Sequence, residues 1–183
     1  MIRRLAALAV LVLVLPAAFP ARGGQSATTQ AMNSGKEHLR RDEYEMALKS
    51  FSRYAELKPG QSHPYDLRAC TYLRMGNLDL ALQDIAESQK IDSSEQTGYA
   101  AYWLKGVALL IQGDQQNANA ALGAATRGSD VAARRYARAQ QNADTIFGKD
   151  EAVDKSGEPY RQKLAELLLD EYVDYELFGE QKQ

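Results

Sequence analysis

Residues 106–122 read GVALLIQGDQQNANAAL, and their pattern of small, turn and bulky positions occurs twice before in the chain. The earlier copies are residues 35–51, GKEHLRRDEYEMALKSF, and residues 69–85, ACTYLRMGNLDLALQDI. Each copy starts with Gly or Ala, has a polar turn in the middle, and then carries an Ala followed four residues later by Phe, Ile or Leu. Successive copies start 34 and then 37 residues apart. A helix, turn and helix that recur at this period predict a stack of helical hairpins.

These copies resemble the tetratricopeptide repeat, whose pattern has Trp, Leu, Gly and Tyr in the first helix, Ala and Phe in the second, and a final Pro. The first repeat matches at Gly35, Ala47, Phe51 and Pro59. The other repeats match at Tyr72, Ala81, Gly106 and Ala118. The Trp place departs from the pattern, since it holds Ala31, Tyr65 and Tyr102. The resemblance covers residues 28–127 and implies an all-α, right-handed α-α solenoid.

Helix start and stop signals divide the chain into further segments. A flexible lead-in is expected at 24–28. The three repeats are expected at about 28–60, 61–94 and 97–128, which together make a repeat region at 29–127. A degenerate first helix of a fourth repeat follows at 129–147, and an amphipathic helix at 158–178. Asp42 is expected to cap the second helix of the first repeat, with Glu45 completing a capping box. The helix at 158–178 is interpreted as a cap that closes the open end of the solenoid. The alternative is that its apolar face docks into a groove, on this chain or another.

The first 23 residues have the layout of a secretory signal peptide. Arg3 and Arg4 precede an apolar run from Leu5 to Leu15, and a stretch of small residues follows. Such a run is too short to cross a bilayer as a helix, which takes about 20 residues. We therefore expect export through the Sec route and no membrane span in the mature chain. The periplasm is the expected location, with secretion as the alternative.

Composition argues against several classes of function. The formal net charge is −2, and it becomes −5 once Arg3, Arg4 and Arg22 are removed with the signal peptide. An acidic chain does not favour nucleic acid as a partner. No catalytic motif, cofactor signature or metal-ligand spacing occurs, so we do not expect an enzyme, a cofactor or a metal site. The single cysteine, Cys70, is interpreted either as a small buried residue or as a thiol open to an intermolecular disulfide.

The resemblance also implies where a partner binds, because the first helices of tetratricopeptide repeats line a concave groove. The groove residues are expected to be Lys36, Arg40, Asp66, Cys70, Leu73, Arg74, Trp103, Val107 and Leu110. They run from basic to apolar along the wall, which suits a protein segment with an acidic part and an apolar anchor. Trp103 is the natural hot spot, unless the chain's own last helix covers it. The Lys and Asn of the family's carboxylate clamp are absent from the matching positions.

A second candidate surface is the cluster formed by Arg127, Arg134, Arg135 and Arg138. It is expected to pair with the acidic tail, or else to meet an anionic lipid or glycan. Taken together, the sequence predicts an exported scaffold that binds a protein or peptide and helps to assemble or position a cell-envelope complex. The alternative is a self-associating structural protein, a homo-oligomer, that uses its last helix.

Overall fold

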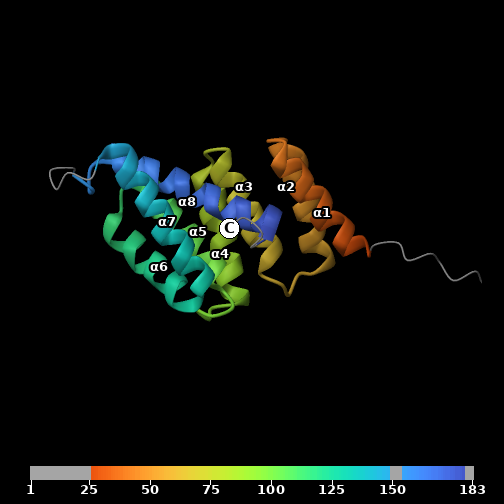
Figure 1. The fold of residues 1–183 in the computed structure, drawn as a ribbon. Helices are drawn as coiled ribbons and strands as arrows, with labels where there is room; N and C mark the ends of the chain where they lie inside the picture. Colours follow the sequence, from red (N-terminus) through yellow and green to blue (C-terminus); the bar gives the residue numbers. More distant parts are fainter. Residues whose placement is uncertain (1–25, 149–153, 180–183) are drawn as a thin grey trace, which may run out of the picture.

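The computed structural model describes residues 26–148 and 154–179, and within them the chain is entirely helical. Three hairpins come first: α1 (Ala27–Arg40) with α2 (Tyr44–Leu57), α3 (His63–Arg74) with α4 (Leu78–Ile91), and α5 (Tyr99–Gln112) with α6 (Gln115–Gly128). Two single helices follow, α7 (Asp130–Phe147) and α8 (Glu158–Phe178). Each hairpin packs on the next through α2 with α3, α4 with α5 and α6 with α7. The result is the expected all-α solenoid (Figure 1).

Small residues allow the two helices of a hairpin to cross closely. A Cβ atom at Gly35 would lie 2.3 Å from Cε1 of Phe51, and one at Gly106 would lie 2.4 Å from Cγ of Leu122. Both distances are far shorter than any ordinary van der Waals contact. The repeating Gly and the repeating bulky residue are therefore two halves of one packing contact, which explains why they keep a constant spacing in the sequence.

The turns inside the hairpins share one backbone conformation. Gly76 and Gly113 have φ values of 73° and 87°, and Asp42 takes the same place in the first hairpin with φ of 57°. The next residue is the N-cap of the second helix: Asn77 and Asp114 accept hydrogen bonds from backbone N–H groups in the first turns of α4 and α6, and Glu43 stands at this place before α2. The expectation that Asp42 caps α2 is therefore wrong. Asp42 supplies the left-handed turn instead, a conformation that Asp tolerates better than most residues.

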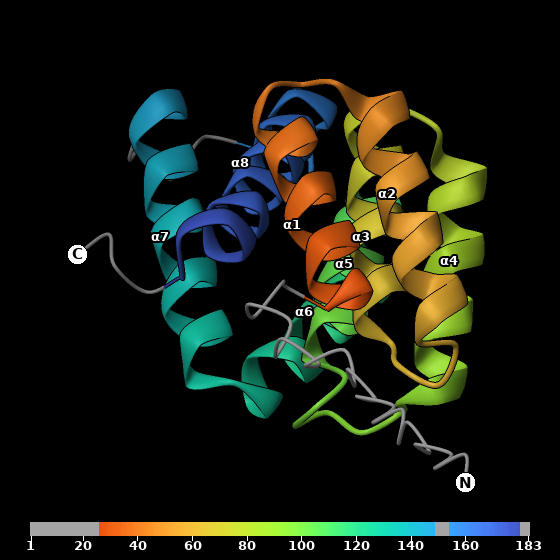
Figure 2. The same cartoon turned by 90° about the vertical axis from the view of Figure 1, so that its right-hand side faces the viewer.

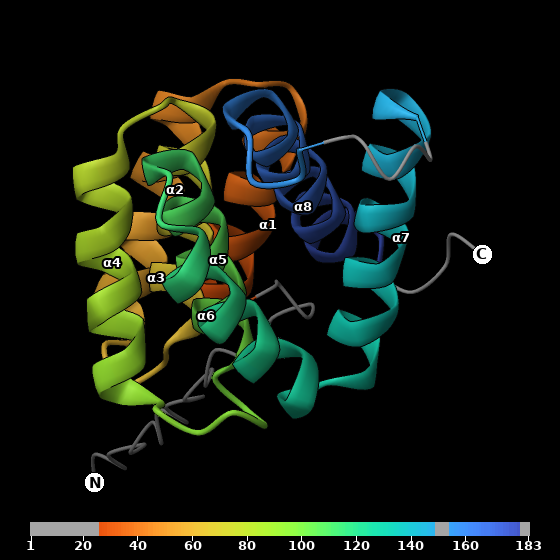
Figure 3. The same ribbon diagram turned by 90° about the vertical axis from the view of Figure 1, so that its left-hand side faces the viewer.

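The last helix lies along the inner side of the solenoid. Figure 2 and Figure 3 show α1, α3 and α5 between α8 on one side and α2 and α4 on the other. α8 packs most extensively on α5 and α7, and it also touches α1 and α3. We expected a cap over the open end, whereas α8 crosses the concave wall. In this position α8 buries one apolar face: Tyr160, Leu164, Ala165, Leu168, Leu169, Tyr172 and Val173.

Candidate functional site

The concave wall is the candidate site, and α8 fills it. Six of the nine expected groove residues are buried: Asp66, Cys70, Leu73, Trp103, Val107 and Leu110. Trp103 is only 2% exposed, and its Nε1 donates a hydrogen bond of 3.0 Å to the backbone oxygen of Leu168 in α8. Trp103 therefore lies against a helix of the same chain.

Ion pairs join the basic side chains of the wall to the acidic side chains of α8. Arg74 lies 2.6 Å from Asp170, and Lys36 lies 3.0 Å from Glu176. Lys36 also donates to the backbone oxygen of Glu176 in the last turn of α8, at 2.9 Å. A cation at this end of a helix is favourable, because the last turn carries the negative end of the helix dipole. The wall thus recognises both the side chains and the end of α8.

Two of the wall's contacts come from residues that the sequence did not single out as groove residues. His63 Nε2 lies 3.0 Å from Oε2 of Glu176, the same carboxylate that Lys36 binds. Arg135 donates to the backbone oxygen of Glu171 at 2.6 Å and stacks over the ring of Tyr175, 4.9 Å from its centroid. The sequence did predict that the cluster containing Arg135 pairs with the acidic tail. For His63, the signal that could have found it is the excess of acidic residues in the last helix. The sequence does not show which acidic residue of the last helix lies opposite which basic residue of the wall.

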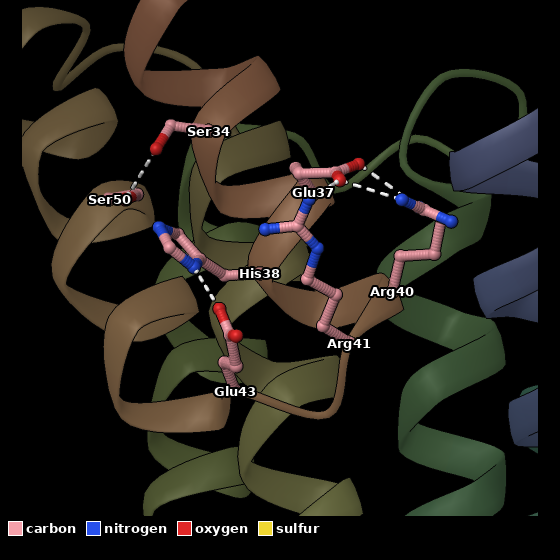
Figure 4. A network of polar contacts seen from close by, with 7 residues as sticks. All are labelled: Ser34, Glu37, His38, Arg40, Arg41, Glu43 and Ser50. Atoms are coloured by element: carbon pink, nitrogen blue, oxygen red, sulfur yellow. Dashed lines mark hydrogen bonds and ion pairs between the residues drawn. The ribbon is translucent and has the colours of Figure 1, made fainter.

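Among the basic residues expected in the groove, Arg40 forms no ion pair with the described part of α8. It is exposed, and its guanidinium bonds to Glu37 at 2.6 Å and 3.0 Å, as Figure 4 shows. Arg41 also pairs with Glu37, while His38 lies 2.6 Å from Glu43 across the first turn. The pairs of Glu37 stabilise the end of α1, and among these contacts only that of His38 joins α1 to the start of α2. Arg40 therefore marks the rim of the wall.

Comparisons with known proteins bear on the fold of this wall. No family model matches the chain, and no curated protein matches it. A solved structure does: the TPR2B-domain:pHsp70-complex of yeast Sti1 has a TM-score of 0.52, with 16% sequence identity, and the match covers 76% of this chain and 97% of that chain. The chain has a tetratricopeptide-like fold. An identity this low carries the likeness of fold alone, so the properties of the wall must be argued from its own residues.

The arginine cluster of this tetratricopeptide-like chain divides between two partners. Arg135 and Arg138 both lie near Glu171 of α8, at 3.2 Å and 3.7 Å. Arg127 instead forms a two-point pair with Glu95, from the loop before α5, at 2.8 Å and 3.1 Å. The predicted pairing of the arginine cluster with the acidic last helix is therefore found for Arg135 and Arg138. Arg127 pairs with a loop instead. It joins the end of α6 to the loop before α5.

Beneath α8 the tetratricopeptide-like wall contains buried ionisable groups. Ser88 Oγ donates to Oδ1 of Asp66 at 2.6 Å, yet burial raises the pKa of Asp66 to about 7. Burial also raises the pKa of Cys70 to about 12, so this thiol is a buried packing residue and a poor nucleophile. Burial works against the charged form of Glu176 too, but the hydrogen bond and charge of His63 and the charge of Lys36 lower its pKa.

The raised pKa of Asp66 makes stability depend on pH. Its folded pKa, about 7, lies above the ordinary 3.8, so its contribution is present in full below 3.8, declines as the pH rises and is lost above about 7. We expect the melting temperature to fall between pH 5 and pH 8. Asp66→Asn, which keeps a hydrogen-bonding group at Ser88, should flatten that decline. An unchanged slope in this variant would assign the pH dependence to another group.

Two negative findings apply to the described part of the chain, residues 26–148 and 154–179. No group of three or more His, Cys, Asp or Glu side chains is placed to hold a metal ion there. None of the helices in those ranges is long and apolar enough to cross a membrane. The expected signal peptide at 1–23 and residues 24 and 25 of the expected lead-in lie outside these residues. The rest of the lead-in is not a flexible segment, because Ser26 caps α1 and the helix starts at Ala27.

Proposed function

We propose that this chain is an exported scaffold that holds a protein segment on its concave wall and takes part in assembling or positioning a bacterial cell-envelope complex. The observation that carries the proposal is the way the wall holds α8. Trp103 binds a backbone oxygen, Arg74 binds a carboxylate in the middle of the helix, and Lys36 binds its last turn. These are contacts suited to a helical protein segment, with no feature specific to a small molecule.

Other observations support the remaining parts of the proposal. Export and an envelope location rest on the basic residues and apolar run at the start of the chain. A scaffold role rests on the tetratricopeptide-like fold, and the similar solved structure is itself a complex, that of a TPR2B domain with pHsp70. The family resemblance makes protein binding the function expected of such a wall.

Crosslinking in living cells tests where the partner binds. A photoreactive amino acid placed at Arg40, on the exposed rim of the wall, should capture a protein in the envelope fraction. The matched control is the same amino acid at Lys90, an exposed residue of α4 on the opposite layer. We expect crosslinks from position 40 and not from position 90. Equal capture from both positions, or none from either, would contradict a partner on the concave side.

Cell fractionation tests the location in the same cells. The full chain should be recovered from the periplasm, and Val10→Asp should retain it in the cytoplasm because a charge in the apolar run blocks signal-peptide function. Thr28→Asp, a charge beyond the expected cleavage region, is the control and should be exported normally. A cytoplasmic wild-type chain would rule out the exported role.

A further inference from the structure

One side chain of α8 is poorly matched to the wall that holds it. Tyr172 is 4% exposed, and its hydroxyl oxygen is buried with no hydrogen-bond partner among the described residues. It lies over the apolar surface around Trp103, beside Tyr99 and Tyr175. A buried hydroxyl that loses its water and gains no partner weakens docking by roughly tenfold. A phenylalanine at this place would keep the ring and avoid that loss.

The end of α8 that carries Tyr172 contacts α1 and α3 as well as α5 and α7. α8 packs closely on α5 and α7, and less on α1 and α3. On that side the helix is held largely through long charged side chains: Arg74 to Asp170, and Lys36 and His63 to Glu176. The Arg74 pair is partly open to water, since the side chain of Asp170 is 48% exposed. The Arg74 pair therefore contributes modestly. The Lys36 pair is more buried, since the side chain of Glu176 is only 10% exposed.

We propose that residues 170–178 of α8 are an intramolecular occupant of a binding site for another protein, and that the site's ligand is an acidic amphipathic helix. This inference rests on the proposed scaffold function and names its partner's chemistry. The ligand has an acidic residue that meets Arg74, a second one six positions later that meets Lys36 and His63, and an apolar ring or aliphatic side chain in the place of Tyr172. Its binding lifts the last turns of α8 away from α1 and α3.

The unmatched hydroxyl favours a different protein over a second copy of this chain. The α8 helix of a second copy brings the same Tyr172 and therefore the same loss. A helix from a different protein that lacks this hydroxyl should bind the wall with roughly tenfold higher affinity than the same helix carrying it.

The test uses two labelled synthetic peptides of residues 166–179, one with the native sequence and one with Tyr172→Phe. Binding to the full-length chain is measured by fluorescence anisotropy. We expect the Tyr172→Phe peptide to bind roughly tenfold more tightly than the native peptide. The same substitution made in the full-length chain should strengthen the docking of its own α8 on the wall. It should therefore weaken binding of either peptide by a similar factor. Two peptides of equal affinity would overturn the inference.

A matched pair of variants locates the peptide. Asp170→Arg in the chain breaks the pair with Arg74 and leaves the wall intact, so peptide binding should rise about fivefold. Arg74→Asp breaks the same pair from the other side and also removes the peptide's own contact, so it should give no net gain. Circular dichroism confirms that both variants are folded, and Asp170→Asn is the milder substitute. Equal gains from both variants, or no peptide binding to any chain, would overturn the proposal.

Sedimentation of the Asp170→Arg chain excludes the other occupant. A monomer is expected at micromolar concentration, and a dimer that excludes the peptide would show that a second copy fills the site. The cellular crosslink from position 40 stands apart from these measurements. If neither peptide binds as expected but the crosslink from position 40 is still observed, the proposed scaffold function is retained. Only the proposal that a ligand displaces the end of α8 is then rejected.

Discussion

Replacing Trp103 with alanine is expected to lower the free energy of unfolding by about 3–5 kcal/mol, as for other buried aromatic side chains. Trp103 is 2% exposed between α5 and α8, and its Nε1 binds the backbone oxygen of Leu168. The substitution removes the ring, leaves a cavity in the middle of the wall and deletes that hydrogen bond. Urea denaturation followed by circular dichroism measures the change, which corresponds to a fall of roughly 10 °C in melting temperature.

Two controls separate packing from partner binding at this position. Trp103→Phe keeps much of the ring and should cost less than the alanine variant. Phe178→Ala removes an exposed ring from the end of α8 and should change stability far less. If Trp103→Ala is as stable as the wild-type chain and loses only partner capture, then α8 does not cover the wall in solution. That result would restore the open groove expected from the sequence.

Gly128→Ala is the second change with a large expected effect, about 3 kcal/mol of destabilisation. A Cβ atom at this position would lie 1.6 Å from the backbone oxygen of Glu95. The clash is with backbone, so no side-chain rotation can relieve it. The loop before α5 would have to move away from the end of α6, breaking the two-point pair of Arg127 with Glu95. Thermal melting followed by circular dichroism measures the loss.

Gly60→Ala is the matched control for this prediction. No atom lies within 4 Å of a Cβ built at Gly60, and its φ lies outside the left-handed region. Alanine there reduces the freedom of the unfolded chain, so the variant should equal the wild type or gain up to about 1 kcal/mol. If the Gly128→Ala and Gly60→Ala chains have the same melting temperature, the loop that contains Glu95 does not pack on the end of α6.

The hairpins could be predicted because their determinants are close together in the sequence. Gly35 and Phe51, like Gly106 and Leu122, are sixteen residues apart and meet across one hairpin. Their spacing therefore survives as a visible period. The turn at Asp42 shows the limit of that reasoning, because Asp is favoured both as a cap and in a left-handed turn. Only alignment with Gly76 and Gly113 distinguishes the two roles.

The state of the concave wall could not be predicted in the same way. Lys36 and Glu176 are 140 residues apart, and His63 and Glu176 are 113 apart. No local pattern fixes which base meets which acid over such separations. The helix at 158–178 is recognisable from its apolar stripe, but an apolar stripe fits an end cap, a groove of the same chain or a groove of another. The sequence therefore left open whether α8 covers the expected groove residues.

The contact of Lys36 with Glu176 joins the first helix to the last. In an ordinary array of repeats each unit touches only its neighbours, so one end can fray while the other stays folded. Here α8 contacts helices from all three hairpins, so repeats that are not neighbours are connected through one helix. Melting is then expected to be all-or-none along the whole length. During synthesis, the earliest hairpins must wait for the final residues to leave the ribosome before the native state is complete.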